Sequence, residues 1–203
     1  MVRLIMEKDH MEKLYSGGNP FVGYIHNKRL DSVIKLIPRK EGIKILDAGC
    51  GEGQLLGKIA ELMSAKLYGV DVTAVAIESA KKRFKEAKFS LGDITNLPYK
   101  NNLFDVVICT EVIEHIRKYK EAIKELKRVV KEGGLLIITF PNEPICIFSR
   151  LIFLRKPRIE DHVNSFSPSK MKKEVNLRMK RKVNLPLNMP DLISLIHIMA
   201  FEK

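Results

Sequence analysis

Tryptophan is absent from the 203 residues, aromatic residues make up 7% of them, and only three residues are cysteines: Cys50, Cys109 and Cys146. The cysteines show no C-x-x-C spacing, so we expect free thiols in a reducing compartment and no disulfide framework. No window contains 18 uninterrupted apolar residues, and residues 1–15 carry acidic side chains without an apolar signal core. These absences argue against a membrane span and a secretory signal, and they predict a cytoplasmic protein.

The chain carries 36 basic and 24 acidic side chains, and 45% of its residues are hydrophobic. This is the composition of a folded globular chain that is long enough for one domain with a sizeable core. The excess positive charge is uneven, since residues 150–182 contain 11 basic and 3 acidic side chains. Two interpretations of this segment stay open: a solvated lysine-rich surface, or a contact with an anionic partner.

A short apolar run, an acidic residue and alternating glycines follow one another between Ile43 and Gln54. A strand, a glycine turn and a helix in this order bring backbone N–H groups and a helix N-terminus up to a ligand. The dinucleotide pattern G-x-G-x-x-G fails because Gln54 stands at its last glycine position, and a P-loop fails because Ile59 follows the G-K pair. The acid before the turn, Asp47, favours a ligand that carries an ammonium group.

Strand-like and helix-like patterns alternate after this turn. We expect strands at residues 44–47, 67–72, 88–91, 104–109 and 135–140, and helices at 55–63, 74–85 and 118–131, the last ended by Gly133 and Gly134. Mostly apolar strands without alternation are typical of parallel strands covered on both faces. A helix at 170–179 and two final strands at 181–185 and 192–202 would add an antiparallel edge. The pattern predicts an α/β fold with a doubly wound, Rossmann-like sheet and helices on both faces.

We expect the whole chain, residues 1–203, to form one domain. Residues 1–40 would be a helical cap, with short helical patterns at 6–15 and 21–37. Residues 41–142 would be the cofactor-binding core. Residues 143–180 would be an insertion that covers the substrate, followed by a helix, and residues 181–203 would be the final strand pair.

Acidic side chains follow four of the expected strands: Asp47, Asp71, Asp93 and Glu111. In open α/β sheets ligands bind at the carboxyl ends of the strands. Asp71 stands where an acid can accept hydrogen bonds from both ribose hydroxyls, and Asp93 stands where a carboxylate can meet an adenine amino group. One such acid is readily explained as a turn residue, but four at successive strand ends indicate a site for a cationic nucleoside.

Five segments together resemble the class I S-adenosylmethionine-dependent methyltransferases over residues 40–142. They are L-D-A-G-C-G-E-G (46–53), G-V-D (69–71), G-D-I-T-N-L-P-Y (92–99), F-D-V-V-I-C-T-E-V-I-E-H-I (104–116) and L-K-R-V-V-K-E-G-G-L-L-I-I-T-F-P-N (126–142). The resemblance implies a methyltransferase that uses S-adenosylmethionine, with a seven-stranded sheet that is mostly parallel and has an antiparallel last strand. It also implies a set of cofactor-binding residues: Asp47, Ala48, Gly49, Cys50, Gly51 and Gly53 for the methionine part, Asp71 with Val72 for the ribose, Asp93 and Ile94 for the adenine, and Thr110 and Glu111 below the sulfonium.

His115 and His162 are the candidates for a general base, because an imidazole titrates near working pH. The alternative for His115 is a packing residue below the strand expected at 104–109, and the alternative for His162 is an exposed loop residue. Alternatively, Glu111 and Glu114 could join both histidines around Mg²⁺, Mn²⁺ or Zn²⁺, which could acidify a substrate hydroxyl. The E-x-x-E-H pattern with a distant histidine resembles that of small-RNA terminal 2′-O-methyltransferases, and more loosely that of ubiquinone-pathway O-methyltransferases.

The acceptor is expected to be a small molecule methylated at oxygen. The segment after the fourth strand is C-T-E-V, which lacks the N/D-P-P motif of base amino methylation and the Pro-Cys pair of carbon-five methylation. Residues 144–168 are apolar and then basic, which suits a substrate with a hydrophobic body and a negative charge. Two alternatives stay open: an RNA methyltransferase that holds RNA on the basic 150–182 segment, and a non-catalytic partner subunit that keeps the cofactor pocket.

Overall fold

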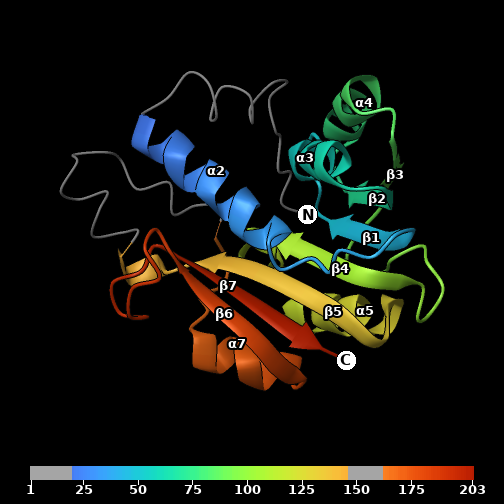
Figure 1. Cartoon of the computed structure of the whole chain (residues 1–203). Coiled ribbons are helices and arrows are strands. Elements are labelled where there is room, and N and C mark those ends of the chain that lie inside the picture. The colour runs from blue at the N-terminus through green and yellow to red at the C-terminus, as the bar shows by residue number, and fades with distance from the viewer. Residues whose placement is uncertain (1–19, 146–161) are drawn as a thin grey trace.

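The structure is a computed structural model that describes residues 20–145 and 162–203. The helical pattern expected at 6–15 and most of the expected substrate cover lie outside these residues. Seven strands form one sheet in the order β3-β2-β1-β4-β5-β7-β6 (Figure 1). The strands are β1 (Ile43–Ala48), β2 (Ala65–Asp71), β3 (Ala87–Leu91), β4 (Phe104–Thr110), β5 (Val130–Pro141), β6 (Arg178–Leu185) and β7 (Ile196–Glu202).

The first five strands pair in parallel, whereas β7 pairs antiparallel with both β5 and β6. The predicted seven-stranded sheet with an antiparallel last strand is therefore confirmed. The order of the strands reverses beside β1, which has β2 on one side and β4 on the other. Open α/β sheets bind their ligands at the carboxyl ends of the strands beside such a switch point, which here are the ends of β1 and β4.

Helices cover both faces of the sheet. The α-helices are α2 (Pro20–Ile34), α3 (Gln54–Leu62), α4 (Ala74–Arg83), α5 (Tyr119–Val129) and α7 (Pro168–Val175). Successive residues of one strand point into different cores: Ile45 of β1 packs in the cluster that includes α2, α3 and α4 residues, and Leu46 packs in the cluster that includes α5 and α7 residues. Both faces are thus buried, which explains why the strands read as continuous apolar runs.

The cap helix α2 lies across one face of the sheet (Figure 1) and buries Ile25, Leu30 and Val33. Its predicted helical pattern is confirmed, although the helix ends at Ile34. Phe21, which the pattern placed on the apolar face, is 53% exposed.

The junction of α5 and β5 differs from the prediction. The helix was expected to run to Lys131 and to stop at two glycines, but it ends at Val129, and Val130 already belongs to β5. The helix ends early because of tertiary contacts. Val130 pairs with Phe104 of β4, and Lys131 donates a hydrogen bond to Asp105 at 2.6 Å. Strand pairing, with a partly exposed ion pair beside it, therefore overrides the helical periodicity of the sequence.

The helix and the two strands at the end of the chain also begin or end at other residues than predicted. The helix predicted at 170–179 is α7, which ends when Asn176 adopts a left-handed conformation with φ 49°. Strand β6 therefore starts at Arg178, three residues earlier than predicted. Strand β7 starts later than predicted, at Ile196, because residues 186–195 form the loop that turns the chain back.

Arg128, near the end of α5, ties the loop between β3 and β4 to the helix. Its guanidinium donates to the carbonyls of Leu97 and Tyr99 at 3.0 and 2.7 Å. It also donates to both carboxylate oxygens of Glu125 at 2.6 and 2.7 Å, and Glu125 accepts from the backbone N–H of Leu97. These hydrogen bonds of Arg128 and Glu125 hold the loop that carries Asp93 against α5.

Replacing Arg128 with Ala should lower the free energy of unfolding by about 1.5–3 kcal/mol, because loop carbonyls and the Glu125 carboxylate lose charge-assisted hydrogen bonds. Urea unfolding followed by circular dichroism measures the loss. Arg128→Lys should recover only part of it, since a single ammonium group cannot bridge both carbonyls and the carboxylate. Equal stability of the Ala variant and the parent would contradict this role.

Candidate active site

The glycine turn after β1 has a backbone that glycine adopts readily, and side chains of the protein pack against its bare Cα atoms. Gly49 and Gly53 both have φ 84°, which side-chain-bearing residues rarely adopt. A Cβ added at Gly49 would lie 2.4 Å from the Val112 side chain. The turn is held to its neighbour by the N–H of Gly49, which donates to the carbonyl of Val70 at 2.7 Å. The expected glycine turn therefore sits at the switch point of the sheet.

Asp47, the last acid before the turn, is buried with 1% exposure. Its Oδ1 has no hydrogen-bond partner among the described residues. Burial, with repulsion from Asp71 as the second cause, raises the pKa of Asp47 to about 7, although Arg29 opposes the shift. An uncompensated buried carboxylate at the edge of a ligand site is a ready partner for a cation.

Asp71 at the end of β2 lies beside the turn. One of its carboxylate oxygens accepts from the N–H of Gly51 at 2.8 Å, and the other accepts from the N–H of Thr73 at 2.8 Å. The next residue, Val72, is 64% exposed. The strand end thus combines a carboxylate fixed by two backbone N–H groups with an exposed apolar side chain.

The segment after β3 agrees less well with the expected adenine site. Asp93 is exposed, and its carboxylate accepts from the N–H of Thr95 at 2.8 Å. Ile94 is 4% exposed and packs in the hydrophobic core, so its side chain is not presented at the surface. The open apolar side chains near this end of the sheet are Leu91, 58% exposed, and Val72.

Glu111, just after β4, adopts a strained backbone conformation with φ 53°. Its N–H donates to the Oγ1 of Thr139 at 3.1 Å, and that hydroxyl donates back to Glu111 Oε1 at 2.8 Å. The other carboxylate oxygen lies 3.7 Å from Arg29. Neighbouring Thr110 ends β4 half-buried. Strand β5 thus fixes the direction in which Glu111 points.

Arg29 is a site residue that the sequence prediction missed. It lies on α2, is 4% exposed, and stands 3.7 Å from Glu111. The signal was present, because position 29 lies four residues from both Ile25 and Val33 and must therefore face the sheet. A cation on the inward face of a helix needs a polar partner, and here the acids at the strand ends supply it.

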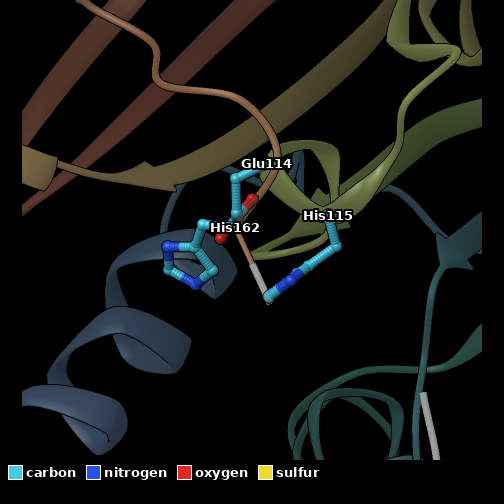
Figure 2. A group of neighbouring side chains, drawn as sticks. All are labelled: Glu114, His115 and His162. Carbon is cyan, nitrogen blue, oxygen red and sulfur yellow. The ribbon is translucent and has the colours of Figure 1, made fainter. Parts of the chain in front are cut away.

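A second group of polar side chains lies beyond β4. Glu114 and His115 belong to the short 3-10 helix η1 (Ile113–His115), and His162 comes from the far end of the chain. One ligand atom from each of these three side chains lies within 4.8 Å of the others, and the side chains converge (Figure 2). The rings of His115 and His162 meet edge to face, with their centroids 4.6 Å apart.

The structure therefore brings together three of the four residues of the hypothetical metal set. Two of these three, His115 and His162, are also the candidate bases. Glu111, the fourth, lies apart from this group and interacts with Thr139 and Arg29. An additional residue, Glu143, contacts the Nδ1 of His162 at 2.5 Å. The sequence prediction missed Glu143, because nothing in its spacing links it to a histidine 19 residues away.

The sheet order, the glycine turn and the acids at the ends of β1, β2 and β4 define a class I S-adenosylmethionine-dependent methyltransferase. A family model described as a methyltransferase domain matches residues 39–182. The chain belongs to this family. In the part of the chain that the structure describes, no helix has the length and apolarity needed to cross a membrane.

Several curated relatives and solved structures are similar to this chain. The mitochondrial ubiquinone biosynthesis O-methyltransferase of Schizosaccharomyces pombe is 31% identical over 153 residues, which are 66% of this chain and 54% of that protein. The tRNA (carboxymethyluridine(34)-5-O)-methyltransferase of Arabidopsis thaliana is 29% identical over 170 residues, covering 80% and 41%. The match thus spans about half the length of these relatives or less.

Magnesium protoporphyrin IX methyltransferase from Synechocystis, solved with bound SAH, has the same fold. Its TM-score is 0.76 at 20% identity, with 96% of this chain and 93% of that chain covered. A Haloferax volcanii methyltransferase, solved in complex with Trm112, has a TM-score of 0.74 at 14% identity over 97% and 98%. These neighbours share the fold of this chain.

The buried carboxylate of Asp47 should make stability depend on pH. Its folded pKa of about 7 exceeds the unfolded value of 3.8, so the unfolded chain releases this proton first as the pH rises. The free energy of unfolding therefore falls between about pH 4 and pH 7, and the loss is complete above pH 7. Asp47→Asn should abolish that loss and raise the unfolding free energy at pH 8 by on the order of 2–4 kcal/mol, with little change at pH 4.

Urea titrations of both proteins at pH 4 and pH 8 measure the difference. Asp105→Asn is the matched control, because hydrogen bonds from Lys131 and the backbone of Lys44 overcome partial burial and lower the pKa of Asp105. That variant should lose stability at pH 8. A parallel destabilisation of both variants at pH 8 would contradict the assigned state of Asp47.

Proposed function

We propose that this protein transfers the methyl group of S-adenosylmethionine to an oxygen atom of a small-molecule acceptor. The observation that carries the proposal is the buried Asp47, which has an oxygen without a partner in the described structure and stands at the switch point beside a glycine turn. Bound S-adenosylmethionine supplies a methyl group already activated on a sulfonium. The chain then has to position the acceptor and remove its proton.

The residues at the strand ends fit the parts of this cofactor. Asp47 is proposed to bind the ammonium group, with Ala48, Gly49, Cys50, Gly51 and Gly53 forming the turn against the methionine part. Asp71 and Val72 would hold the ribose, Asp93 the adenine amino group, and Thr110 and Glu111 would lie below the sulfonium. Ile94 would support the adenine site from within the core. Arg29, which is buried on α2 and lies 3.7 Å from Glu111, is the cation proposed to contact the carboxylate of the cofactor.

The proton of the acceptor hydroxyl is proposed to leave at the histidine pair beyond β4. Glu143 engages the Nδ1 of His162, so the imidazole is held in one orientation and its second nitrogen faces away from that carboxylate. An imidazole that a carboxylate orients in this way can accept a proton through its free nitrogen. His115 lies beside it and is the alternative base.

The acceptor is proposed to have a hydrophobic body. Apolar side chains stand exposed on the loop between β6 and β7: Leu187 (72%), Leu192 (81%) and Ile193 (45%). This loop lies at the end of the sheet where β5 finishes, since Pro141 pairs with Ile196, the first residue of β7. Val163, next to His162, is 39% exposed. Exposed apolar side chains at this edge suit an acceptor with a ring or a lipid-like chain.

S-adenosylmethionine should raise the melting temperature of the full chain, because it binds the folded state alone. Asp71→Asn removes a negative charge but retains an acceptor oxygen for the turn, so it should weaken cofactor binding by about 10- to 100-fold. Isothermal titration calorimetry measures the affinity. Glu86→Gln, an equal charge change at an exposed position, should bind like the parent. Unchanged affinity in the Asp71 variant would show that the ribose assignment is wrong.

The acceptor itself is tested by transfer of a labelled methyl group from the cofactor into fractionated small-molecule, lipid and RNA extracts. Label is expected in a small-molecule or lipid fraction, as an alkali-stable ether or an ester. His162→Gln should lower the rate about 10²- to 10⁴-fold and leave cofactor affinity within about twofold, as expected for the loss of a proton acceptor. Cofactor binding without transfer into any fraction would favour the partner-subunit alternative.

RNA is the second candidate acceptor, and one observation favours it. The described part of the basic 150–182 segment presents exposed lysines and arginines on α7 and β6: Lys170, Lys172, Lys173, Arg178, Lys180 and Arg181. The relative that matches 80% of the chain is a tRNA methyltransferase. Label in the RNA fraction, with binding that weakens steeply as salt rises, would replace the small molecule by RNA.

A further inference from the structure

A cavity of about 810 Å³ lies at the amino ends of the central strands, away from the glycine turn. Its wall includes Ile43, the first residue of β1, and Asp105, the second residue of β4. The acids of the candidate active site lie at the other ends of these strands. At a rise of about 3.3 Å per residue, β1 alone separates the two ends by roughly 17 Å. The cavity is therefore distinct from the candidate active site.

The cavity lies on the face of the sheet that α2 crosses. Residues that follow α2, namely Lys35, Leu36 and Pro38, form one side of it, and residues of β5, β6 and β7 form the other. Figure 1 shows α2 crossing the strands at an angle, with no described helix in front of the ends of β6 and β7 near the C-terminus. The fold thus brings segments that are far apart in the sequence together around one cavity.

The apolar part of the cavity wall is continuous with the hydrophobic core. Ile43 and Ala200 are buried core residues, and Leu36, Leu135 and Val183 are partly buried side chains packed against the same cluster. Partly buried apolar side chains still contact water. An apolar group that displaces this water would extend the core, which is favourable. The wall therefore favours a ligand with an apolar body.

The charged part of the wall carries more positive than negative side chains. Five are basic and three are acidic: Lys35, Lys40, Lys131, Lys180 and Arg181, and Asp105, Glu132 and Glu202. Each of the acids already has a basic partner, in the pairs Lys131–Asp105 at 2.6 Å, Lys180–Glu202 at 3.3 Å and Lys203–Glu132 at 3.2 Å. The negative charge of the wall is therefore compensated, and an excess of positive charge is left.

Lys35 and Arg181 carry this excess, because neither side chain pairs with an acid among the residues that the structure describes. Both are exposed. They stand on different sides of the cavity, since Lys35 directly follows α2 and Arg181 belongs to β6. A guanidinium donates to both oxygens of a carboxylate or phosphate, and an ammonium group adds a compact second charge. These two cations are therefore available to the anionic group of a ligand.

We propose that this cavity is a second, non-catalytic binding site for an amphipathic anion, a small molecule with one carboxylate or phosphate group and an apolar body. Arg181 and Lys35 would bind the anionic group, and the apolar part of the wall would bind the body. The cavity volume lies within the range of about 300–1,000 Å³ that is typical of small-molecule sites. A bound ligand would join the end of α2 to β6 and so stabilise the position of the helix that carries Arg29. The proposal does not depend on methyl transfer.

Binding is tested on the full chain by calorimetry with sodium decanoate, a probe with one carboxylate and an apolar chain. Decanoate should bind and raise the melting temperature, because it binds the folded state. Arg181→Gln and Lys35→Gln should each weaken this binding about 5- to 50-fold, since each removes a charge-assisted contact. Lys173→Gln, an equal charge change at an exposed position of α7 outside the cavity, should bind decanoate like the parent.

Two further probes separate the two parts of the site. Decanol lacks the charge and inorganic phosphate lacks the apolar chain, so both should bind more weakly than decanoate. Equal affinity for either of them would overturn the proposal. Parent-like binding of decanoate by the Arg181 and Lys35 variants would overturn it as well, because the probe would then sit elsewhere, for example beside the proposed acceptor. Absence of decanoate binding, alongside a normal thermal shift with S-adenosylmethionine, would remove this site and leave the proposed function standing.

Discussion

Uncompensated negative charge at the carboxyl ends of the central strands is the constraint on which the site depends. Asp47, Asp71, Glu111 and Glu114 lie there, and Arg29 is the buried cation that acts on this group. Two of these carboxyl groups are almost fully buried and have an oxygen without a partner among the described residues. Charges in such surroundings weaken the empty fold, so the structure holds free energy that cationic ligands can recover.

The sheet tolerates this charge because strand pairing and buried apolar side chains hold its backbone in place. Strand β1 pairs with β2 and β4, and Ile45 and Leu46 are fully buried on its two faces. The strained φ of Glu111 persists because β5 fixes that residue through both the backbone and the hydroxyl of Thr139. A rigid apolar frame can therefore carry strained and charged residues at its edge, where ligands meet them.

The sheet, its helices and the acids at the strand ends could be predicted from the sequence. Glycine spacing and apolar runs reflect the local conformation of the backbone, which the nearby residues determine. The prediction failed where contacts with residues far away in the sequence determine the structure. Val130 became a strand residue through its pairing with Phe104, Ile94 turned into the core, and the contact of Glu143 with His162 depends on the path of the chain between them. Arg29 could have been found, because its spacing from Ile25 already placed it on the buried face of α2.

Arg29 also links the two parts of the site. It opposes the raised pKa of both Asp47 and Glu114, and it stands 3.7 Å from Glu111. If the carboxylate of the cofactor takes this guanidinium, as we propose, the acids beyond β4 lose part of their compensation. One buried arginine thus acts on both of the buried acids, Asp47 and Glu114, at the carboxyl ends of the central strands.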